Sequence, residues 1–143
     1  MPAQTQISKT IINAYYNAHY RVTGAGKEFV MRPKRKSEDL AVLMKKYDVQ
    51  SAAFLTAYNP FSVVIKEPQN VRANKAMAVD LKKTGLKFFK GSGEDPSGNW
   101  KIEASFLVLG ITEEAARELG IKYLQNAVIW VGNDAVSKVI LLR

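Results

Sequence analysis

The chain has 143 residues, of which 47% are hydrophobic and 24% charged, and these are the values of a globular domain able to bury a core. It has no cysteine and a single histidine, His19, so disulfides, thiolate nucleophiles and most metal sites are excluded, and no cofactor is expected. No apolar run approaches the roughly 20 residues that span a bilayer, and no signal segment is visible. We therefore expect a cytoplasmic protein with no membrane contact.

Positive charge is concentrated in the first half of the chain. The net charge is +8, and residues 1–50 carry nine basic and four acidic side chains, whereas residues 101–143 carry five of each. The densest basic cluster comprises Arg32, Lys34, Arg35 and Lys36. This cluster predicts an anionic partner such as nucleic acid, and the competing interpretation is a solvated basic surface.

The first 50 residues predict a helix, a hairpin and a second helix. Apolar residues at helical spacing predict a helix from Ile7 to about Tyr20, with His19 near its end. Two extended runs, Tyr20–Thr23 and Lys27–Arg32, flank a glycine-containing loop, as in a β-hairpin. Ser37 is expected to cap the second helix. The apolar face of that helix is expected to comprise Leu40, Leu43, Met44 and Tyr47.

The middle of the chain is organised around the stretch Ser51–Ser62. It begins as a short apolar run, which fits a buried strand, and it ends in Asn59-Pro60, a strong turn signal. A third helix is expected from Asn70 to Thr84, because apolar positions recur at helical spacing and a C-terminal glycine, Gly85, follows.

An antiparallel strand pair is expected next. Its strands are Leu86–Lys90 and Trp100–Gly110, the second being the longest strand of the chain. The turn-rich loop Gly91–Asn99 between them leaves no room for a crossover. This loop lacks the Gly-Lys-Ser/Thr ending and the following helix of a phosphate-binding loop. We therefore expect a hairpin loop, with a flap over a binding site as the alternative.

A helix and a final hairpin complete the chain. Thr112 is expected to cap a helix that ends near Gly120 or Tyr123. Ala127–Val131 and Val136–Leu142 are expected to pair as the last two strands. Residues 1–143 are therefore predicted to form a single α+β domain, with a mixed, mainly antiparallel sheet and about four helices packed on it.

Several short motifs occur in the order found in a known family. They are Thr56-Ala57-Tyr58-Asn59-Pro60, the helix-opening pair Asn70 and Arg72, a glycine-rich loop, Trp100-x-x-Glu103-x-Ser105-Phe106 with Gly110, and Gln125-Asn126-Ala127-Val128. From about Tyr20 to the C-terminus, the chain resembles the bacterial family of unknown function DUF3293. It departs from that family at Phe61-Ser62-Val63, which follows the Asn-Pro turn, and in its more basic cluster. The resemblance implies a shared fold and site and brings no established activity.

Polar side chains interrupt the apolar strands at three places, and we expect them to line one concavity. Polar groups at a strand exit are a usual position for a binding site, and Glu103 and Ser105 share one face of their strand because side chains alternate. The candidate catalytic residue is Glu103. The candidate ligand-binding residues are Thr56, Tyr58, Asn59, Ser62, Asn70, Arg72, Ser105, Gln125 and Asn126.

These residue types suit a small polar or phosphorylated, nucleotide-like ligand. A partly buried Glu103 would have a raised pKa and could act as a general base. Arg72 suits a phosphate or carboxylate, and the side-chain amides suit the edges of a base or sugar. Whether the protein is an enzyme, and its oligomeric state, stay open at this point. The alternative function is nucleic-acid or protein binding through the basic N-terminal half.

Each candidate also has a structural interpretation. Asn59-Pro60 is a normal turn, and Asn70 is a possible helix cap. Glu103 is a possible partner for a lysine on a neighbouring strand, and Gln125 could satisfy backbone groups of a loop.

Overall fold

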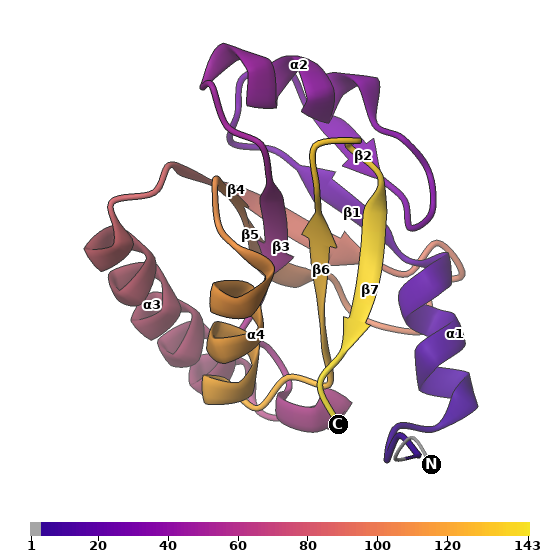
Figure 1. Cartoon of the computed structure of the whole chain (residues 1–143). Coiled ribbons are helices and arrows are strands. Elements are labelled where there is room, and N and C mark those ends of the chain that lie inside the picture. Colours follow the sequence, from indigo (N-terminus) through magenta and orange to yellow (C-terminus); the bar gives the residue numbers. More distant parts are fainter. Residues whose placement is uncertain (1–3) are drawn as a thin grey trace.

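The computed structural model describes residues 4–143, in which one seven-stranded sheet is surrounded by four α-helices and a short 3-10 helix (Figure 1). The helices are α1 (Lys9–Asn17), α2 (Glu38–Lys46), η1 (Pro60–Ser62), α3 (Glu67–Thr84) and α4 (Glu113–Lys122). The strands are β1 (His19–Val22), β2 (Phe29–Met31), β3 (Ala52–Leu55), β4 (Phe88–Glu94), β5 (Glu103–Leu109), β6 (Ala127–Val131) and β7 (Ser137–Leu141). The predicted α+β class, with an antiparallel sheet and four helices, is confirmed.

The sheet is curled, and its two edges meet. The strand order is β2-β1-β4-β5-β3-β6-β7, and every neighbouring pair is antiparallel. Past the end of β2, Pro33 bridges to Ser137 at the start of β7, and Lys36 bridges to Val136. The curled sheet therefore has an inner and an outer face, and each is covered by apolar side chains.

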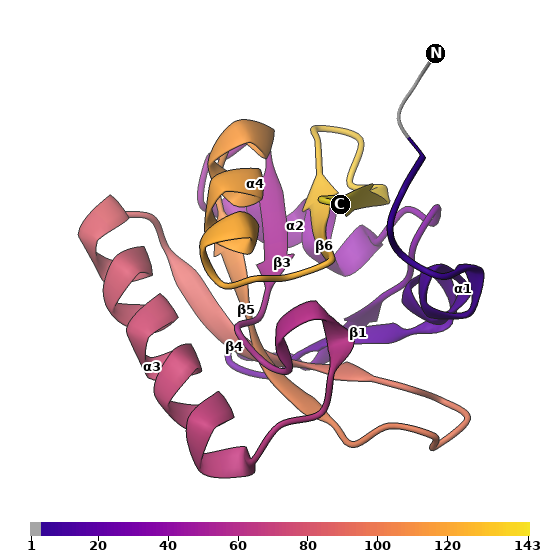
Figure 2. The ribbon, with the colours of Figure 1, turned by 90° about the horizontal axis from the view of Figure 1, so that it is seen from below.

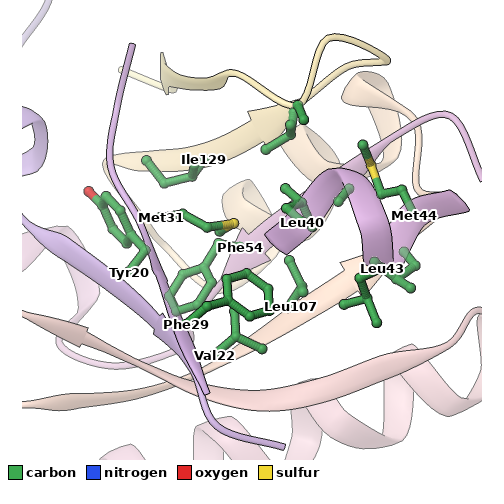
Figure 3. Packing of buried hydrophobic residues seen from close by; sticks show 14 of the residues in the cluster. Tyr20, Val22, Phe29, Met31, Leu40, Leu43, Met44, Phe54, Leu107 and Ile129 are labelled. Carbon is green, nitrogen blue, oxygen red and sulfur yellow. The ribbon is translucent and has the colours of Figure 1, made fainter. Parts of the chain in front are cut away.

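The inner face carries the main core, which α2 closes at one end (Figure 3). Alternate residues of the strands point inward, as the two-residue period of a strand requires. Tyr20 and Phe54 meet edge to face, with ring centroids 5.3 Å apart. Helix α2 contributes Leu40, Leu43 and Met44, three of the four residues predicted for its apolar face. The fourth, Tyr47, follows the helix and is exposed.

The outer face is covered by α3 and α4, which lie side by side in both views of the ribbon (Figures 1 and 2). Met77 and Leu81 of α3 and Ala116 of α4 pack on the strand residues that face outward. Helix α1 and η1 lie at the end of the molecule away from α2 (Figure 1). That end of the inner face is therefore not closed by α2.

The expected helix caps are present. Ser37 Oγ accepts a hydrogen bond from the Leu40 amide at 3.1 Å, and Thr112 Oγ1 accepts one from the Ala115 amide at 3.1 Å. Gly85 ends α3 with a φ of 76°, a left-handed conformation that glycine adopts without strain. None of the helices in residues 4–143 has the length and apolarity needed to cross a membrane.

Two expected boundaries near the sheet are wrong. Helix α1 ends at Asn17, and His19 is the first residue of β1 because it pairs with Glu94 of β4. The predicted glycine loop is shorter than expected, because β4 continues through Gly91 and Gly93 to Glu94. A Cβ on Gly91 would lie 2.4 Å from the carbonyl oxygen of Arg21, so the glycine allows the close pairing of β4 with β1.

Two further boundaries differ as well. Strand β5 begins at Glu103 and has seven residues, as β4 does, so Trp100 lies before it and β5 is not uniquely the longest strand. Helix α3 begins at Glu67 with a proline in its first turn, a position that proline tolerates because the N–H it lacks would have no helical partner. Asn70 therefore lies within α3 and does not cap it.

Candidate functional site

A pocket opens at the end of the curled sheet that α2 leaves uncovered. The space between its walls and in its open mouth together is about 680 Å³. Tyr20, Phe54 and Ile129 from the inner face of the sheet are part of its lining. Seven of the ten candidate residues also line it: Thr56, Tyr58, Asn59, Ser62, Glu103, Ser105 and Gln125.

The remaining three candidates lie outside the lining. Asn70 is 2% exposed and is hydrogen-bonded to Asn59, a residue of the lining. Asn126 is buried and donates a hydrogen bond to Ser62 Oγ at 3.1 Å. Arg72 is exposed on α3 and is not brought to the pocket. Residues two apart on a helix do not face the same side, so the burial of Asn70 turns Arg72 outward.

Asn59 is held in place by a reciprocal pair of hydrogen bonds with Asn70. The Asn59 backbone N–H donates to Asn70 Oδ1, and Asn70 Nδ2 donates to Asn59 Oδ1, both at 2.8 Å. The amide of Ile65 also donates to Asn59 Oδ1, at 3.2 Å. Asn59 has a φ of 47°, a left-handed conformation in which asparagine is enriched. The Asn59-Pro60 turn is thus built around the side chain of Asn59.

The Asn59 side chain positions the carboxylate of Glu103. Asn59 Nδ2 donates to Glu103 Oε2 at 2.7 Å. No lysine, arginine or histidine of residues 4–143 forms an ion pair with Glu103, so the lysine partner considered from the sequence is not found. Burial raises the pKa of Glu103, and the hydrogen bond from Asn59 opposes part of that rise. Glu103 is a partly buried carboxylate without a charged partner among the described residues.

The second carboxylate of the lining, Glu94, is in a different state. Arg21 Nε donates to Glu94 Oε2 at 2.8 Å and Arg21 Nη2 donates to Oε1 at 3.2 Å, a bidentate pair. Ser92 Oγ donates to the same carboxylate at 3.0 Å. These hydrogen bonds, from Arg21 above all, hold the pKa of Glu94 below its usual range. The negative charge of Glu94 is therefore already balanced by the positive charge of Arg21.

Most side-chain donors of the lining are used by the protein itself. Gln125 Nε2 donates to the carbonyls of Tyr58 and Tyr123, which is the arrangement that the structural interpretation of Gln125 described. The hydroxyls of Thr56 and Ser105 donate to the backbone carbonyls of β5, Thr56 to Ala104 and Ser105 to Glu103. The pocket therefore offers mainly acceptors and apolar surface to a ligand.

Aromatic rings form much of the wall. The Tyr20 hydroxyl donates to the Tyr15 carbonyl at 2.7 Å, and the Tyr58 hydroxyl donates to Glu67 Oε1 at 2.6 Å. Burial, together with Glu67, raises the pKa of Tyr58 to about 12, so this hydroxyl stays protonated. Trp100 is 43% exposed and lies at the pocket, whereas Phe54 is buried in its floor.

The turn at η1 is strained next to the pocket. Phe61 and Ser62 have φ values of 54° and 62°, which are uncommon for residues with a side chain. The Ser62 and Tyr15 hydroxyls are 2.5 Å apart, and the Arg143 guanidinium lies 4.0 Å from the Phe61 ring centroid. Such strain persists where surrounding contacts enforce it and is frequent at functional sites.

Three lining residues from the N-terminal segment, Tyr15, Ala18 and Tyr20, were not among the candidates. Tyr15 of α1 and Tyr20 of β1 reach the pocket because β1 pairs with β4, next to β5. The sequence shows a run of aromatic residues around His19, and this run was the available signal. Its interpretation as one long helix concealed the strand.

Other sites in the described part of the chain offer less chemistry. Residues 4–143 contain no group of three or more His, Asp or Glu side chains placed to hold a metal ion. A second, more open hollow lies between the end of α3 and the start of α4, and its lining includes Leu86, Ile111 and Leu119. None of the ten candidate residues reaches it, so we place the functional site in the first pocket.

Comparison with known proteins gives one match. The model of a family described as "Protein of unknown function (DUF3293)" matches residues 55–128, which is about half of the chain. This segment begins at the last residue of β3 and includes α3, β4, β5 and α4. It is shorter than the resemblance expected from the sequence, which begins near Tyr20. No curated protein and no solved structure matches the chain.

Proposed function

Since the chain belongs to the DUF3293 family, for which no activity is known, we propose from its pocket that it binds a small polar ligand whose N–H or O–H groups are accepted by Glu103. One observation carries this proposal: Glu103 is a partly buried carboxylate in a pocket, with a neutral amide as its hydrogen-bond partner. Desolvating a charge is costly unless it is compensated. A ligand that donates to the carboxylate supplies that compensation.

Of the two kinds of ligand expected from the sequence, polar and phosphorylated, the lining favours an unphosphorylated polar ligand. No lysine, arginine or histidine of the described residues lines the pocket, and phosphate groups in proteins are bound by such cations or by free backbone amides. Arg143, whose guanidinium lies over the Phe61 ring, is outside the lining. A phosphorylated ligand would therefore have to keep its phosphate at the mouth of the pocket.

Glu103 is also the group suited to chemistry. A carboxylate with a raised pKa can take a proton from a bound ligand near neutral pH. Asn59 holds one of its oxygens at 2.7 Å and the turn around Asn59 is rigidly hydrogen-bonded. We propose Glu103 as the general base of any reaction at this site, with Asn59 as its positioning residue.

A fragment screen by NMR tests the binding proposal. The side-chain amide signals of Asn59 and Gln125 report on the pocket, because both residues line it. We expect small polar fragments to shift these signals, and Gly93→Val to abolish the shifts by filling the pocket next to Ser105, the nearest side chain to a Cβ at Gly93. Fragments that bind only elsewhere, or equally well to the Gly93→Val protein, would refute the proposal.

Nucleic-acid binding is the second candidate, favoured by the exposure of Lys34, Arg35 and Lys36. It is weakened because Lys34 stacks over the Tyr16 ring at 4.8 Å and Lys36 pairs with Glu38 at 3.5 Å. Arg32 is partly buried, so the four side chains do not form one open surface. A cytoplasmic location is proposed on composition alone.

A further inference from the structure

The charge of the pocket is opposite in sign to that of the chain. The sequence has a net charge of +8, yet the lining contains two carboxylates, Glu94 and Glu103, and no cationic side chain of the described residues. A protein with this excess of lysine and arginine would readily supply one to a site for anions. The lining therefore points to a ligand that is itself positively charged.

Only one of the two carboxylates is free for such a ligand. Arg21 occupies both oxygens of Glu94, at 2.8 and 3.2 Å. Glu103 has a hydrogen bond from Asn59 to Oε2, and no hydrogen bond from residues 4–143 reaches its Oε1. One carboxylate oxygen facing a pocket is too few for Ca²⁺ or Mg²⁺, which take six or more oxygen ligands, and it suits a single charged donor.

The donors of the lining lead to the same conclusion. The hydroxyls of Thr56, Tyr20 and Tyr58 donate to protein acceptors, and both hydrogen bonds of the Gln125 amide nitrogen go to backbone carbonyls. An anionic ligand would find few free donors here. A ligand rich in N–H groups would find an acceptor in Glu103.

The walls suit a cation with an apolar body. Five aromatic side chains line the pocket, and their ring faces attract cations. They are Tyr15, Tyr20, Phe54, Tyr58 and Trp100. Val128 and Ile129 add aliphatic surface.

We infer that the pocket binds a protonated amine, with its ammonium N–H bonded to Glu103 and a small apolar or aromatic body packed against Phe54 and Ile129. This inference rests on the proposed function and names the ligand class of the same site. A primary or secondary ammonium meets the requirement, because it carries both the charge and the N–H donor.

Three probes of similar shape separate charge from shape: benzylamine, benzyl alcohol and benzoate. Their affinities are measured near pH 7 from the Asn59 and Gln125 side-chain amide signals, up to about 10 mM, where a millimolar ligand saturates. Benzylamine and benzyl alcohol can both donate a hydrogen bond to Glu103, and only benzylamine adds a positive charge, whose attraction to a carboxylate is stronger in a partly buried site than in water. We therefore expect benzylamine to bind roughly tenfold to a hundredfold more tightly than benzyl alcohol. In Glu103→Gln this preference should disappear. The matched control is Glu114→Gln, which removes an exposed carboxylate of α4 outside the lining and should keep it.

The outcomes separate this inference from the proposed function. If benzyl alcohol or benzoate binds the pocket as tightly as benzylamine, or if Glu103→Gln keeps the preference, the inference is overturned and the binding proposal stands. If none of the three probes shifts the pocket signals while other fragments do, the inference is again overturned. If no fragment of any charge shifts them, the binding proposal falls with it.

Discussion

The Asn59 side-chain amide donates a 2.7 Å hydrogen bond to Glu103 Oε2, and the two residues come from a turn and a strand that are 44 positions apart in the chain. The contact links a left-handed turn, fixed by Asn70, to the one carboxylate of the pocket that has no charged partner. Geometry and chemistry of the site therefore depend on three side chains that can be changed one at a time.

Replacing Glu103 by Gln should make the protein more stable at pH 7. A carboxyl whose folded pKa lies above its unfolded value of about 4.3 costs stability once the pH exceeds the folded pKa, and costs nothing well below the unfolded pKa. Burial raises the pKa of Glu103. The pKa values of Tyr15, Tyr20 and Tyr58 are raised as well, so these groups are neutral near pH 7 and give the carboxylate no positive charge. Thermal melts of both proteins should therefore differ at pH 7 and coincide near pH 3. A clear loss of stability at pH 7 would mean that the charge has a buried cationic partner.

Replacing Asn70 by Ala should destabilise the protein by about 1–3 kcal/mol, the cost of leaving a buried donor unsatisfied. The change removes the acceptor of the Asn59 N–H and the donor to Asn59 Oδ1. Arg72→Ala, in the same helix and exposed, is the matched control and should stay within about 0.5 kcal/mol. Urea unfolding measures both. Equal effects would show that the Asn70–Asn59 pair contributes nothing particular.

Two alanine substitutions in β4 should differ sharply. A Cβ at Gly91 would lie 2.4 Å from the Arg21 carbonyl oxygen and 2.9 Å from the Phe54 ring, whereas at Gly93 the nearest atom is Ser105 Oγ at 3.9 Å. We expect Gly91→Ala to cost about 1–3 kcal/mol, as overpacking does, and Gly93→Ala to cost less than 1 kcal/mol. Guanidinium unfolding measures the stability of both variants. If Gly91→Ala is as stable as the unchanged protein, β1 and β4 can move apart without a loss of stability.

Binding of RNA or DNA through the basic cluster would depend steeply on salt. Each neutralised phosphate releases counterions, so affinity should fall by orders of magnitude between about 50 and 200 mM salt. Because Lys34 and Lys36 already contact Tyr16 and Glu38, we expect weak binding or none at 50 mM. Tight binding that Lys34→Ala and Arg35→Ala abolish would instead favour the nucleic-acid alternative.

Local features of the fold were predictable from the sequence and long-range features were not. The caps Ser37 and Thr112 and the terminal Gly85 depend on a few neighbouring residues, and such signals are visible in a sequence. The entry of His19 into β1 depends on pairing with Glu94, which no local pattern reveals. Gly91 of β4 was assigned to a loop for the same reason, since its role is set by the close approach of the Arg21 carbonyl.

The lining of the pocket was predicted at its strand-end residues, and its N-terminal wall was not predicted. Thr56, Glu103 and Gln125 interrupt apolar strands, and a polar side chain in such a position is recognisable without the fold. Tyr15 lines the pocket only because the sheet curls. Arg72 does not line it, because α3 buries Asn70 and thereby turns Arg72 to the exposed side of the helix. The positions of Tyr15 and Arg72 depend on how the helices and strands pack together, and the hydrophobic periodicity of the sequence does not specify that packing.

The strand order of the curled sheet also bears on how the chain folds. Arg21 of β1 and Glu94 of β4 are 73 residues apart in sequence, and β3 is paired between β5 and β6, both far downstream. Antiparallel sheets dominated by such non-local pairs fold slowly, on the order of milliseconds to seconds, because long loops must close first. The pocket walls come from α1, β1, β3, η1, β4, β5 and β6, so no partly folded intermediate that lacks one of these elements can form the complete pocket. A ligand present during refolding should therefore leave the folding rate unchanged and slow only unfolding.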